Sequence, residues 1–321
     1  MTETLPAEPF PCARFIKEIG RGPHGARALS PEDTRSLYSA MLDGRVSDLE
    51  LGAVLLAYRL KGETADELAA MLTAAQASIT PIRAAGAVSI PSYNGARKQP
   101  NLVPLLAMLL AREGVPTLVH GVTEDPGRIT SAEIFARLGI EPAGSRADIE
   151  AGLASRQLAF APVEVLAPKL ARLLALRRIM GVRNSTHTLI KILQPFAPAG
   201  LRLVNYTHPA YRDSLAELFL GHPEAAAGGA LLARGTEGEA VADTRRQVQI
   251  DWLHDGAAET LVSPERGADG DAGPELPAAR DADTTARWIE AVLRGDAPVP
   301  PTLARQVQEI VRIVKVGRRA Q

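Results

Sequence analysis

The first third of the chain repeats apolar positions with a helical period. Ser30 is a cap residue and Pro31 fits the first helical position, so this dipeptide indicates a helix start before an apolar stripe. Two later segments begin with the Ser/Thr-x-x-Glu spacing of a capping box, at residues 47–50 and 64–67. The short connections between these elements predict a compact helical bundle.

After residue 81 the period changes, because short apolar runs alternate with helical stripes. Thr130 and Glu133 have the spacing of a further capping box. This alternation predicts a mostly parallel sheet with helical crossovers. The expected strands are 87–91, 115–120, 157–161, 201–206, 229–233 and 248–253, and the expected helices are 101–112, 130–139, 166–180, 184–193, 284–293 and 302–316.

The predicted fold class is therefore α/β, with a small N-terminal helical domain and a larger domain built on the sheet. We expect the helical domain at residues 1–81, joined by the helix 165–182, and the α/β domain at residues 82–321, ending in a basic helix. Residues 263–283 are rich in Gly, Pro, Ala and Asp and are expected to form an exposed loop.

Composition is that of a globular protein, with 46% hydrophobic and 23% charged residues. The net charge of −1 by itself argues against a nucleic-acid-binding protein. The charges are segregated, however. Residues 165–212 contain eight Lys and Arg and no acid, whereas residues 237–283 contain twelve acids and four Arg. Such segregation permits a strongly polarised surface potential despite a sum near zero.

Cys12 is the single cysteine, so no disulfide forms within one chain and a reducing, cytoplasmic location is expected. The N-terminus lacks the pattern of a secretory signal, and no apolar run has the length of a membrane span. The scattered histidines suggest no metal site. No metal, cofactor or membrane is expected as a partner.

The N-terminal third resembles the helical domain of the anthranilate and pyrimidine-nucleoside phosphoribosyl-transferring family. The resemblance rests on residues 44–68, with Lys-Gly-Glu-Thr at 61–64, and continues through His120-Gly121 and residues 181–195. It implies a glycosyltransferase-type fold and a homodimer joined through the helical domains. The apolar positions expected at that interface are Leu37, Met41, Leu51 and Leu55.

The phosphate-binding motifs of that family are degenerate here. A glycine-rich loop binds phosphoribosyl pyrophosphate in the family because its backbone N–H groups wrap the phosphates. The equivalent residues 91–98 keep a single glycine, and residues 119–123 lack the family's lysine and arginine. What remains is a vestigial phosphate site made of Ser92, Asn94, Gly95 and His120. We therefore expect no enzymatic activity and no catalytic residue.

Residues 92–99 and 177–191 resemble one subgroup, the YbiB-type DNA-binding relatives of anthranilate phosphoribosyltransferase. This resemblance implies binding of nucleic acid without sequence specificity, to single- and double-stranded DNA and to RNA, along basic grooves of a homodimer. The expected contacts are Arg97, Lys98, Arg177, Arg178, Arg183, Lys191, Arg202, Arg312, Lys315, Arg318 and Arg319.

Other interpretations stay open for these residues. The cations at 177–183 could complement a helix dipole, the loop cations could be merely solvated, and the basic C-terminus could serve solubility. Tyr93 and Tyr206 could stack on bases, and His120 and His187 are more often structural. The rival function is a transferase or phosphorylase that uses Ser92, Asn94, His120 and Arg183 around a phosphate. A third is a protein-interaction module.

Overall fold

The computed structural model describes residues 10–22, 24–265 and 276–319, without the side chains of residues 318 and 319. The chain divides into two compact units. Unit 1 contains the residues up to Thr80 together with Ala167–Leu193, and unit 2 contains Pro81–Leu166 and Gln194–Gln321. The segment that returns to the helical unit thus extends to residue 193, beyond the expected 182.

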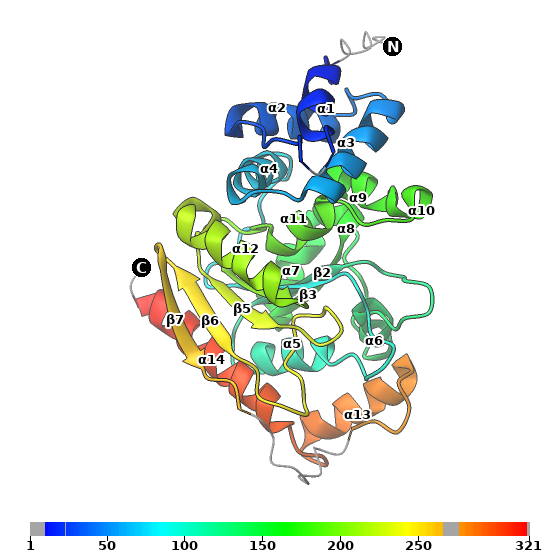
Figure 1. Cartoon of the computed structure of the whole chain (residues 1–321). Helices are drawn as coiled ribbons and strands as arrows, with labels where there is room; N and C mark the ends of the chain where they lie inside the picture. Colours follow the sequence, from blue (N-terminus) through cyan, green and yellow to red (C-terminus); the bar gives the residue numbers. More distant parts are fainter. Residues whose placement is uncertain (1–9, 23, 266–275, 320–321) are drawn as a thin grey trace. The chain divides into compact units, whose positions relative to one another are not determined.

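The described residues of unit 1 form helices and connecting loops without a strand, and α2 packs on α4, α1 on α3, and α11 on α4 and α9 (Figure 1). Its helices are α1 (Ala13–Ile19), α2 (Pro31–Leu42), α3 (Asp48–Lys61), α4 (Ala65–Ala77), α9 (Pro168–Ala175), α10 (Arg177–Met180) and α11 (Thr186–Ile192). The single helix expected at 166–180 is instead broken into short pieces, since Pro168 opens a new helix after a non-helical Ala167.

All three predicted helix starts in unit 1 are confirmed, because Ser30, Ser47 and Thr64 are the N-cap residues of α2, α3 and α4. The Ser30 side chain accepts the Asp33 N–H, and Thr64 with Glu67 forms a complete capping box. The box predicted at Ser47 is wrong, because the Ser47 hydroxyl donates to the Glu50 carboxylate at 2.6 Å and caps no backbone N–H.

The apolar positions that the sequence analysis assigned to a dimer interface are buried in the core of unit 1. Leu37, Met41, Leu51 and Leu55 are only 1–3% exposed, so that assignment is wrong for all four. They alternate with polar positions because they face the neighbouring helices of the same bundle. The exposed apolar positions of α3 lie on another face, at Leu49, Leu56 and Leu60.

Unit 2 is built on a seven-stranded sheet with the order β3-β2-β1-β4-β5-β6-β7. The first five strands in this order are parallel and the last two pair antiparallel, which confirms the predicted mostly parallel α/β class. The strands are β1 (Val88–Ser92), β2 (Thr117–Gly121), β3 (Leu158–Pro162), β4 (Leu201–Tyr206), β5 (Ala230–Arg234), β6 (Ile250–His254) and β7 (Ala257–Val262).

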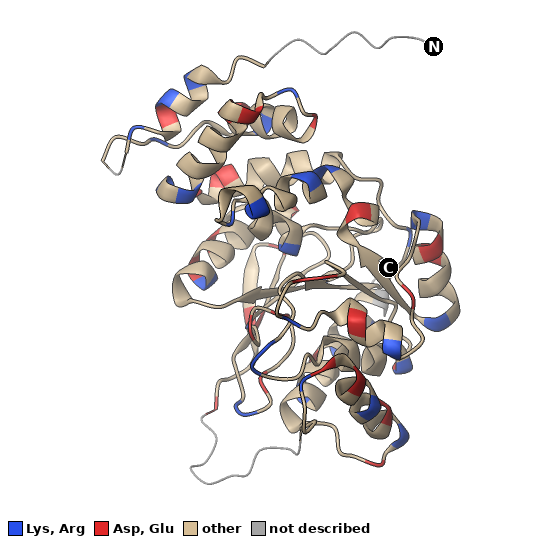
Figure 2. Cartoon of the chain, turned by 90° about the vertical axis from the view of Figure 1, so that its right-hand side faces the viewer, with Lys and Arg blue, Asp and Glu red and all other residues tan. Residues whose placement is uncertain are grey.

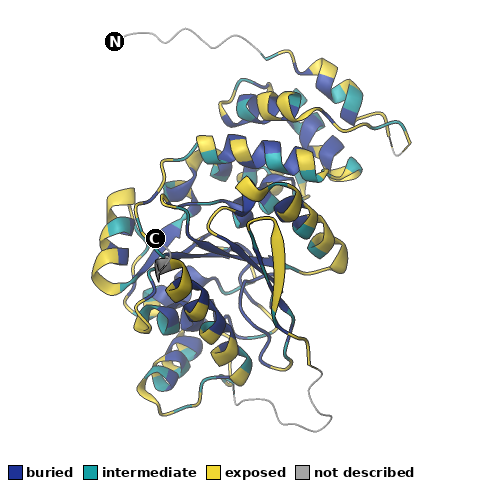
Figure 3. Ribbon diagram, turned by 90° about the vertical axis from the view of Figure 1, so that its left-hand side faces the viewer, coloured by how far each residue is buried: buried dark blue, intermediate teal, exposed yellow. Residues whose placement is uncertain are grey.

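Helices cover both faces of this sheet (Figure 1). One layer contains α5 (Val103–Arg112), α6 (Ser131–Arg137), α13 (Ala282–Arg294) and α14 (Pro301–Arg319). The other contains α7 (Arg146–Arg156), α8 (Val163–Leu166) and α12 (Pro209–Gly221), followed by the short 3-10 turn Pro223–Ala226. The strands are buried between the layers except β7, which is largely exposed at the sheet edge (Figure 3). None of the described helices combines the length and the apolar character needed to cross a membrane.

The strand order places a topological switch point between β1 and β4. From β1 the chain proceeds to β2 and β3 on one side, and from β4 to β5 on the other. In open α/β sheets, ligands bind beyond the carboxyl ends of the strands at such a point. The loop 93–99 after β1 and the segment 235–243 after β5 follow the carboxyl ends of strands at or next to this point.

Candidate functional site

The loop after β1 has its backbone N–H groups turned toward two carboxylates of the same unit. Glu239 accepts from the N–H groups of Asn94 and Gly95 through one oxygen, at 2.7 and 2.8 Å. Glu237 accepts from the three N–H groups of Arg97, Lys98 and Gln99, at 3.2, 2.7 and 2.7 Å. Five donors of the loop that the sequence equates with a phosphate-binding loop are therefore already bonded to internal anions.

The segment that carries these two glutamates is fixed to the loop by further polar contacts. The carbonyl oxygen of Gly238 accepts from the side-chain amides of Asn94 and Asn205, at 2.6 and 2.8 Å. Gly238 has φ +88°, and a Cβ there would collide with the Asn94 amide, so only glycine fits.

The four residues of the vestigial phosphate site are all buried. Ser92 shares a hydrogen bond of 2.7 Å with Ser131, which also accepts from the Asn101 amide at 3.2 Å. His120 is fully buried, and burial lowers its pKa to about 3. Asn94 and Gly95 are held by Glu239. Their polar groups are thus directed inward in this structure, toward other residues of unit 2.

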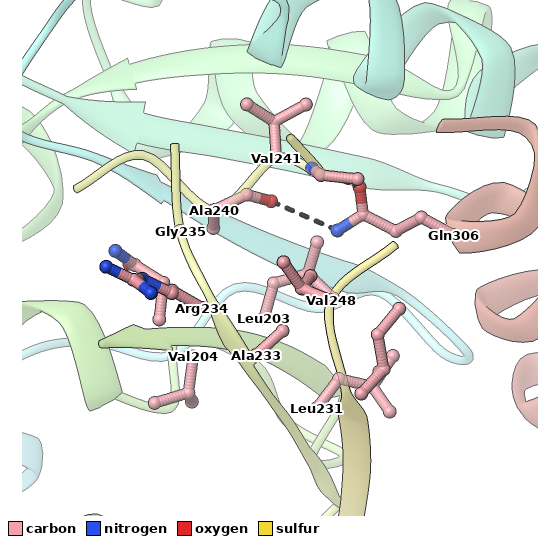
Figure 4. A pocket seen from close by; sticks show the side chains of 13 residues that line it. Leu203, Val204, Leu231, Ala233, Arg234, Gly235, Ala240, Val241, Val248 and Gln306 are labelled. Atoms are coloured by element: carbon pink, nitrogen blue, oxygen red, sulfur yellow. Dashed lines mark hydrogen bonds between the residues drawn. The ribbon is translucent and has the colours of Figure 1, made fainter. Parts of the chain in front are cut away.

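A shallow recess lies beside this region, at the carboxyl ends of β4 and β5 (Figure 4). Its empty space, including the part open to solvent, is about 350 Å³. Most of its lining is apolar, and Gln306 crosses one side with its amide donating to the Ala240 carbonyl at 3.3 Å. Arg234 is its single cationic lining residue, so the recess lacks the charges that a phosphorylated ligand needs.

The basic residues of α10 and α11 form a second candidate site, within unit 1. We call Arg177, Arg178, Arg183 and Lys191 the α10–α11 basic cluster. Arg177 and Arg178 are exposed, and in the described part of the chain no carboxylate lies within ion-pair distance of either. Arg183 and Lys191 are half-buried.

His187 reports the positive field of this cluster. Burial, followed by the charges of Arg183, Arg177 and Lys191, lowers the pKa of His187 to about 4. Its Nδ1 lies within hydrogen-bond distance of Asn184, whose amide in turn donates to the Leu173 carbonyl at 3.0 Å. The imidazole is therefore neutral at pH 7. The sequence-based expectation of a structural histidine agrees with this environment.

Three further cations of the acid-free stretch are engaged by partners distant in sequence. Lys169 pairs with Asp43 at 2.6 Å, and Arg212 pairs with Asp251 at 3.0 Å. Arg172 donates to the carbonyl oxygens of Met41 and Leu42. The lack of acids in this stretch of sequence therefore overstates its free positive charge, because the fold brings Asp43 to Lys169 and Asp251 to Arg212 and directs Arg172 to backbone carbonyls.

Arg202 is the clearest failure among the predicted contacts. It is 1% exposed in β4, donates to the carbonyl oxygens of Ala225 and Ala227, and lies over the Phe219 ring at 5.5 Å from guanidinium carbon to centroid. Burial lowers its pKa to about 10. The prediction that Arg202 contacts nucleic acid is wrong, since β4 is a central strand and its side chains are covered.

Four other predicted contacts in unit 2, at Arg97, Lys98, Arg312 and Lys315, are exposed but differ in their partners. The side chains of Arg97 and Lys98 are exposed, with no carboxylate within ion-pair distance among the described residues. On α14, Arg312 pairs with Glu309 at 2.8 Å and with Glu259 at 3.6 Å, and Lys315 lies 3.8 Å from Glu113. Arg318 and Arg319 belong to α14, but their side chains lie outside the described residues. Basic and acidic positions occur in both units (Figure 2).

The Lys-Gly-Glu-Thr run at 61–64 serves the structure of unit 1. Lys61 binds Glu67 at 2.6 Å, and both side chains are at least nine-tenths buried. Glu67 also accepts from the Leu29 and Thr64 N–H groups, at 3.0 Å each. Glu63 accepts from the Ser185 hydroxyl and so ties this run to the start of α11.

Comparisons with known proteins agree with this architecture. Residues 13–79 match the family model described as glycosyl transferase family, helical bundle domain. The chain superposes on anthranilate phosphoribosyltransferase from Thermus thermophilus with a TM-score of 0.70, covering 95% of this chain and 93% of that one at 21% identity. The yeast enzyme in complex with PRPP and Mg gives a TM-score of 0.72 at 13% identity, covering 97% and 89%. The fold is that of the anthranilate phosphoribosyltransferases.

A closer relative defines the family. The uncharacterized protein YbiB of Escherichia coli is 44% identical over 315 residues, which cover 96% of this chain and 95% of YbiB. The chain belongs to the YbiB family. It is also 32% identical to anthranilate phosphoribosyltransferase 2 of Ralstonia nicotianae over 187 residues, 57% of this chain and about half (53%) of that enzyme.

Proposed function

We propose that this protein binds nucleic acid through the phosphate backbone, accepting single- and double-stranded DNA and RNA without sequence specificity. The observation that carries the proposal is the α10–α11 basic cluster. Arg177 and Arg178 extend from a four-residue helix with no carboxylate beside them in the described chain, and the charges of Arg183, Arg177 and Lys191 help to lower the pKa of His187. A surface of this kind favours a polyanion.

Binding would be electrostatic. Lys and Arg side chains displace condensed counterions from the phosphates, so the affinity falls as the salt concentration rises. Arg97 and Lys98, and Arg312, Lys315, Arg318 and Arg319 on α14, are proposed as additional contacts. The exposed ion pairs Arg312–Glu259 and Lys315–Glu113 do not oppose this role, because such pairs contribute only about 0–1 kcal/mol.

The alternative is an enzyme, and the comparisons taken alone favour it, because the relatives with a named activity are anthranilate phosphoribosyltransferases. The geometry of the loop 93–99 opposes it. Its N–H donors are bonded to Glu237 and Glu239, which leaves them without capacity for the phosphates of phosphoribosyl pyrophosphate. Anthranilate-dependent consumption of phosphoribosyl pyrophosphate by the purified protein would establish the enzyme instead.

The homodimer is likewise a proposal, now placed on a different face of α3. Leu49, Leu56 and Leu60 are 85%, 45% and 79% exposed. Their spacing of seven and four residues puts them on one side of the helix. An exposed row of leucines on one helix is suited to a partner surface of the same kind.

The direct test is a titration of a labelled single-stranded oligonucleotide by fluorescence anisotropy over a range of salt concentrations. The proposal expects tight binding at low salt and a linear fall of log K with log salt. Duplex DNA and RNA of the same length should give similar slopes. A protein that binds none of the three at low salt contradicts the proposed function.

A further inference from the structure

The contact between loop 93–99 and segment 235–243 has the form of an anion in its binding site. Successive N–H groups that converge on one point make a concave anion-binding nest. Here the N–H groups of residues 94 and 95 converge on Glu239, and those of residues 97, 98 and 99 converge on Glu237. Charge-assisted hydrogen bonds of this kind are stronger than neutral ones.

The turn that delivers the two carboxylates is strained. Thr236 and Glu239 exchange both backbone hydrogen bonds, at 3.0 and 2.9 Å, around the two central residues Glu237 and Gly238. Both central residues have positive φ, +52° and +88°. Such a type I′ turn favours Asn-Gly, and a glutamate in the left-handed region is disfavoured by its Cβ. The hydrogen bonds that the Glu237 carboxylate accepts from the three loop N–H groups offset the unfavourable backbone conformation of Glu237.

Cations from other segments lie near the nest. Arg128 donates to the Gly95 carbonyl at 3.2 Å, and Arg280 donates to the Arg97 carbonyl at 3.4 Å. The Glu237 charge also raises the pKa of Arg245 in part, after the larger effect of Asp243, so this arginine lies nearby as well. These positive groups would remain in place if the carboxylate moved away.

We propose that the turn Thr236–Glu239 is an internal plug whose carboxylates occupy a functional oxyanion site, and that removing them lets the loop 93–99 bind a phosphate or pyrophosphate group. The ligand class follows from the donors: backbone N–H groups and arginines recognise tetrahedral oxyanions. This inference does not depend on nucleic-acid binding by the α10–α11 basic cluster, which uses residues of unit 1.

The experiment compares two variants with a matched control. Glu237→Gly removes one carboxylate and relieves the backbone strain, and Glu237→Gly/Glu239→Ala empties the whole nest. The control is Asp255→Gly. Asp255 has φ +48° and precedes Gly256 in the turn between β6 and β7, so this change also removes one negative charge and one left-handed side chain. The Asp255 carboxylate contacts His254 and no loop N–H group in the described chain.

Inorganic pyrophosphate is titrated by calorimetry, and amide hydrogen exchange is followed at Lys98 and Gln99. The wild type and Asp255→Gly should show no binding of pyrophosphate below about 10 mM. Glu237→Gly should bind pyrophosphate at least about tenfold more tightly than this limit. The double variant should bind more tightly again. The two amides should exchange slowly in the wild type, faster in Glu237→Gly, and slowly again with pyrophosphate.

A short single-stranded oligonucleotide provides the second arm and distinguishes a free oxyanion from a backbone phosphate. A gain in affinity for either ligand that Asp255→Gly does not show supports the proposal. The ligand for which the affinity rises tells whether the site takes a free oxyanion or a backbone phosphate. If Glu237→Gly is folded but gains neither, the proposal is overturned. If the glycine variant fails to fold, Glu237→Asn replaces it, because asparagine suits this turn. If Glu237→Asn shows no gain in affinity for either ligand, the proposal is overturned.

Discussion

The hydroxyl of Tyr93 and the Nδ1 atom of His120 are hydrogen-bonded at 2.7 Å, with their rings edge to face at 5.4 Å between centroids. The Nε2 atom of the same imidazole lies 3.0 Å from the Ser89 hydroxyl. All three side chains are at least nine-tenths buried. The suggestion that Tyr93 stacks on bases is therefore wrong, because its ring belongs to the interior of unit 2. Tyr206 is half-buried, and its role stays open.

This burial of His120 predicts a pH-dependent stability. The folded-state pKa of His120 is about 3, well below the ordinary 6.5 of an exposed imidazole. Below pH 6.5 the unfolded state binds more protons, so the stabilisation present above that pH is lost as the pH falls toward 3. The slope for one proton reaches about 1.4 kcal/mol per pH unit. Denaturant titrations at pH 7, 6 and 5 measure it, and NMR should show no titration of His120 between pH 7 and 5. A His120 midpoint near 6.5 would contradict the buried environment.

A second prediction concerns Arg202. Arg202→Met keeps the apolar stem and removes the donors to the Ala225 and Ala227 carbonyls. We expect the free energy of unfolding to fall by about 1–3 kcal/mol, because buried acceptors lose their partner. The salt dependence of nucleic-acid binding should not change. Arg234→Met on β5 is the control, since that side chain is exposed and its loss should leave stability nearly unchanged. A reduced salt slope in Arg202→Met would restore Arg202 as a contact.

The third prediction tests the surface proposed for the homodimer. Leu56→Asp/Leu60→Asp places two charges in the exposed leucine row of α3. A dimer that buries this row should dissociate, since unpaired charges are costly to bury. Light scattering coupled to gel filtration measures the mass at micromolar concentration. Leu220→Asp on α12, at a residue 38% exposed in unit 2, should leave the mass unchanged. A monomeric wild type, or a double variant that remains dimeric, contradicts the assignment.

The fold was predictable where local signals and burial agree. The five parallel strands are short buried apolar runs, and the boxes at Thr64 and Thr130 give clear helix starts. The helices α7 and α12 and the strand β7 were not expected. Strand β7 is exposed and carries little apolar pattern, although the Asp255-Gly256 dipeptide before it is typical of a hairpin turn.

The site was predictable only in part, because its defining contacts are non-local. The degenerate loop was visible in the sequence, but Glu237 and Glu239 lie about 140 residues from the amides they bind. In the sequence alone they are only two members of an acidic segment. The burial of Arg202 was missed for a related reason, since charge was counted along the chain without regard to its place in a central strand. A Glu-Gly-Glu turn after a buried strand is the signal that could have drawn attention to the plug.

The measurement that tests the central proposal most directly is the salt dependence of oligonucleotide binding in Arg177→Gln/Arg178→Gln. Each lost phosphate contact reduces the slope of log K against log salt by about 1, so two lost contacts should flatten it by about 2 and weaken single and double strands alike. Arg245→Gln/Arg246→Gln is the control with the same charge change, at residues paired with Asp243 in unit 2, and should retain the wild-type slope. Equal slopes and affinities in the wild type and in Arg177→Gln/Arg178→Gln would contradict the α10–α11 basic cluster as the binding site.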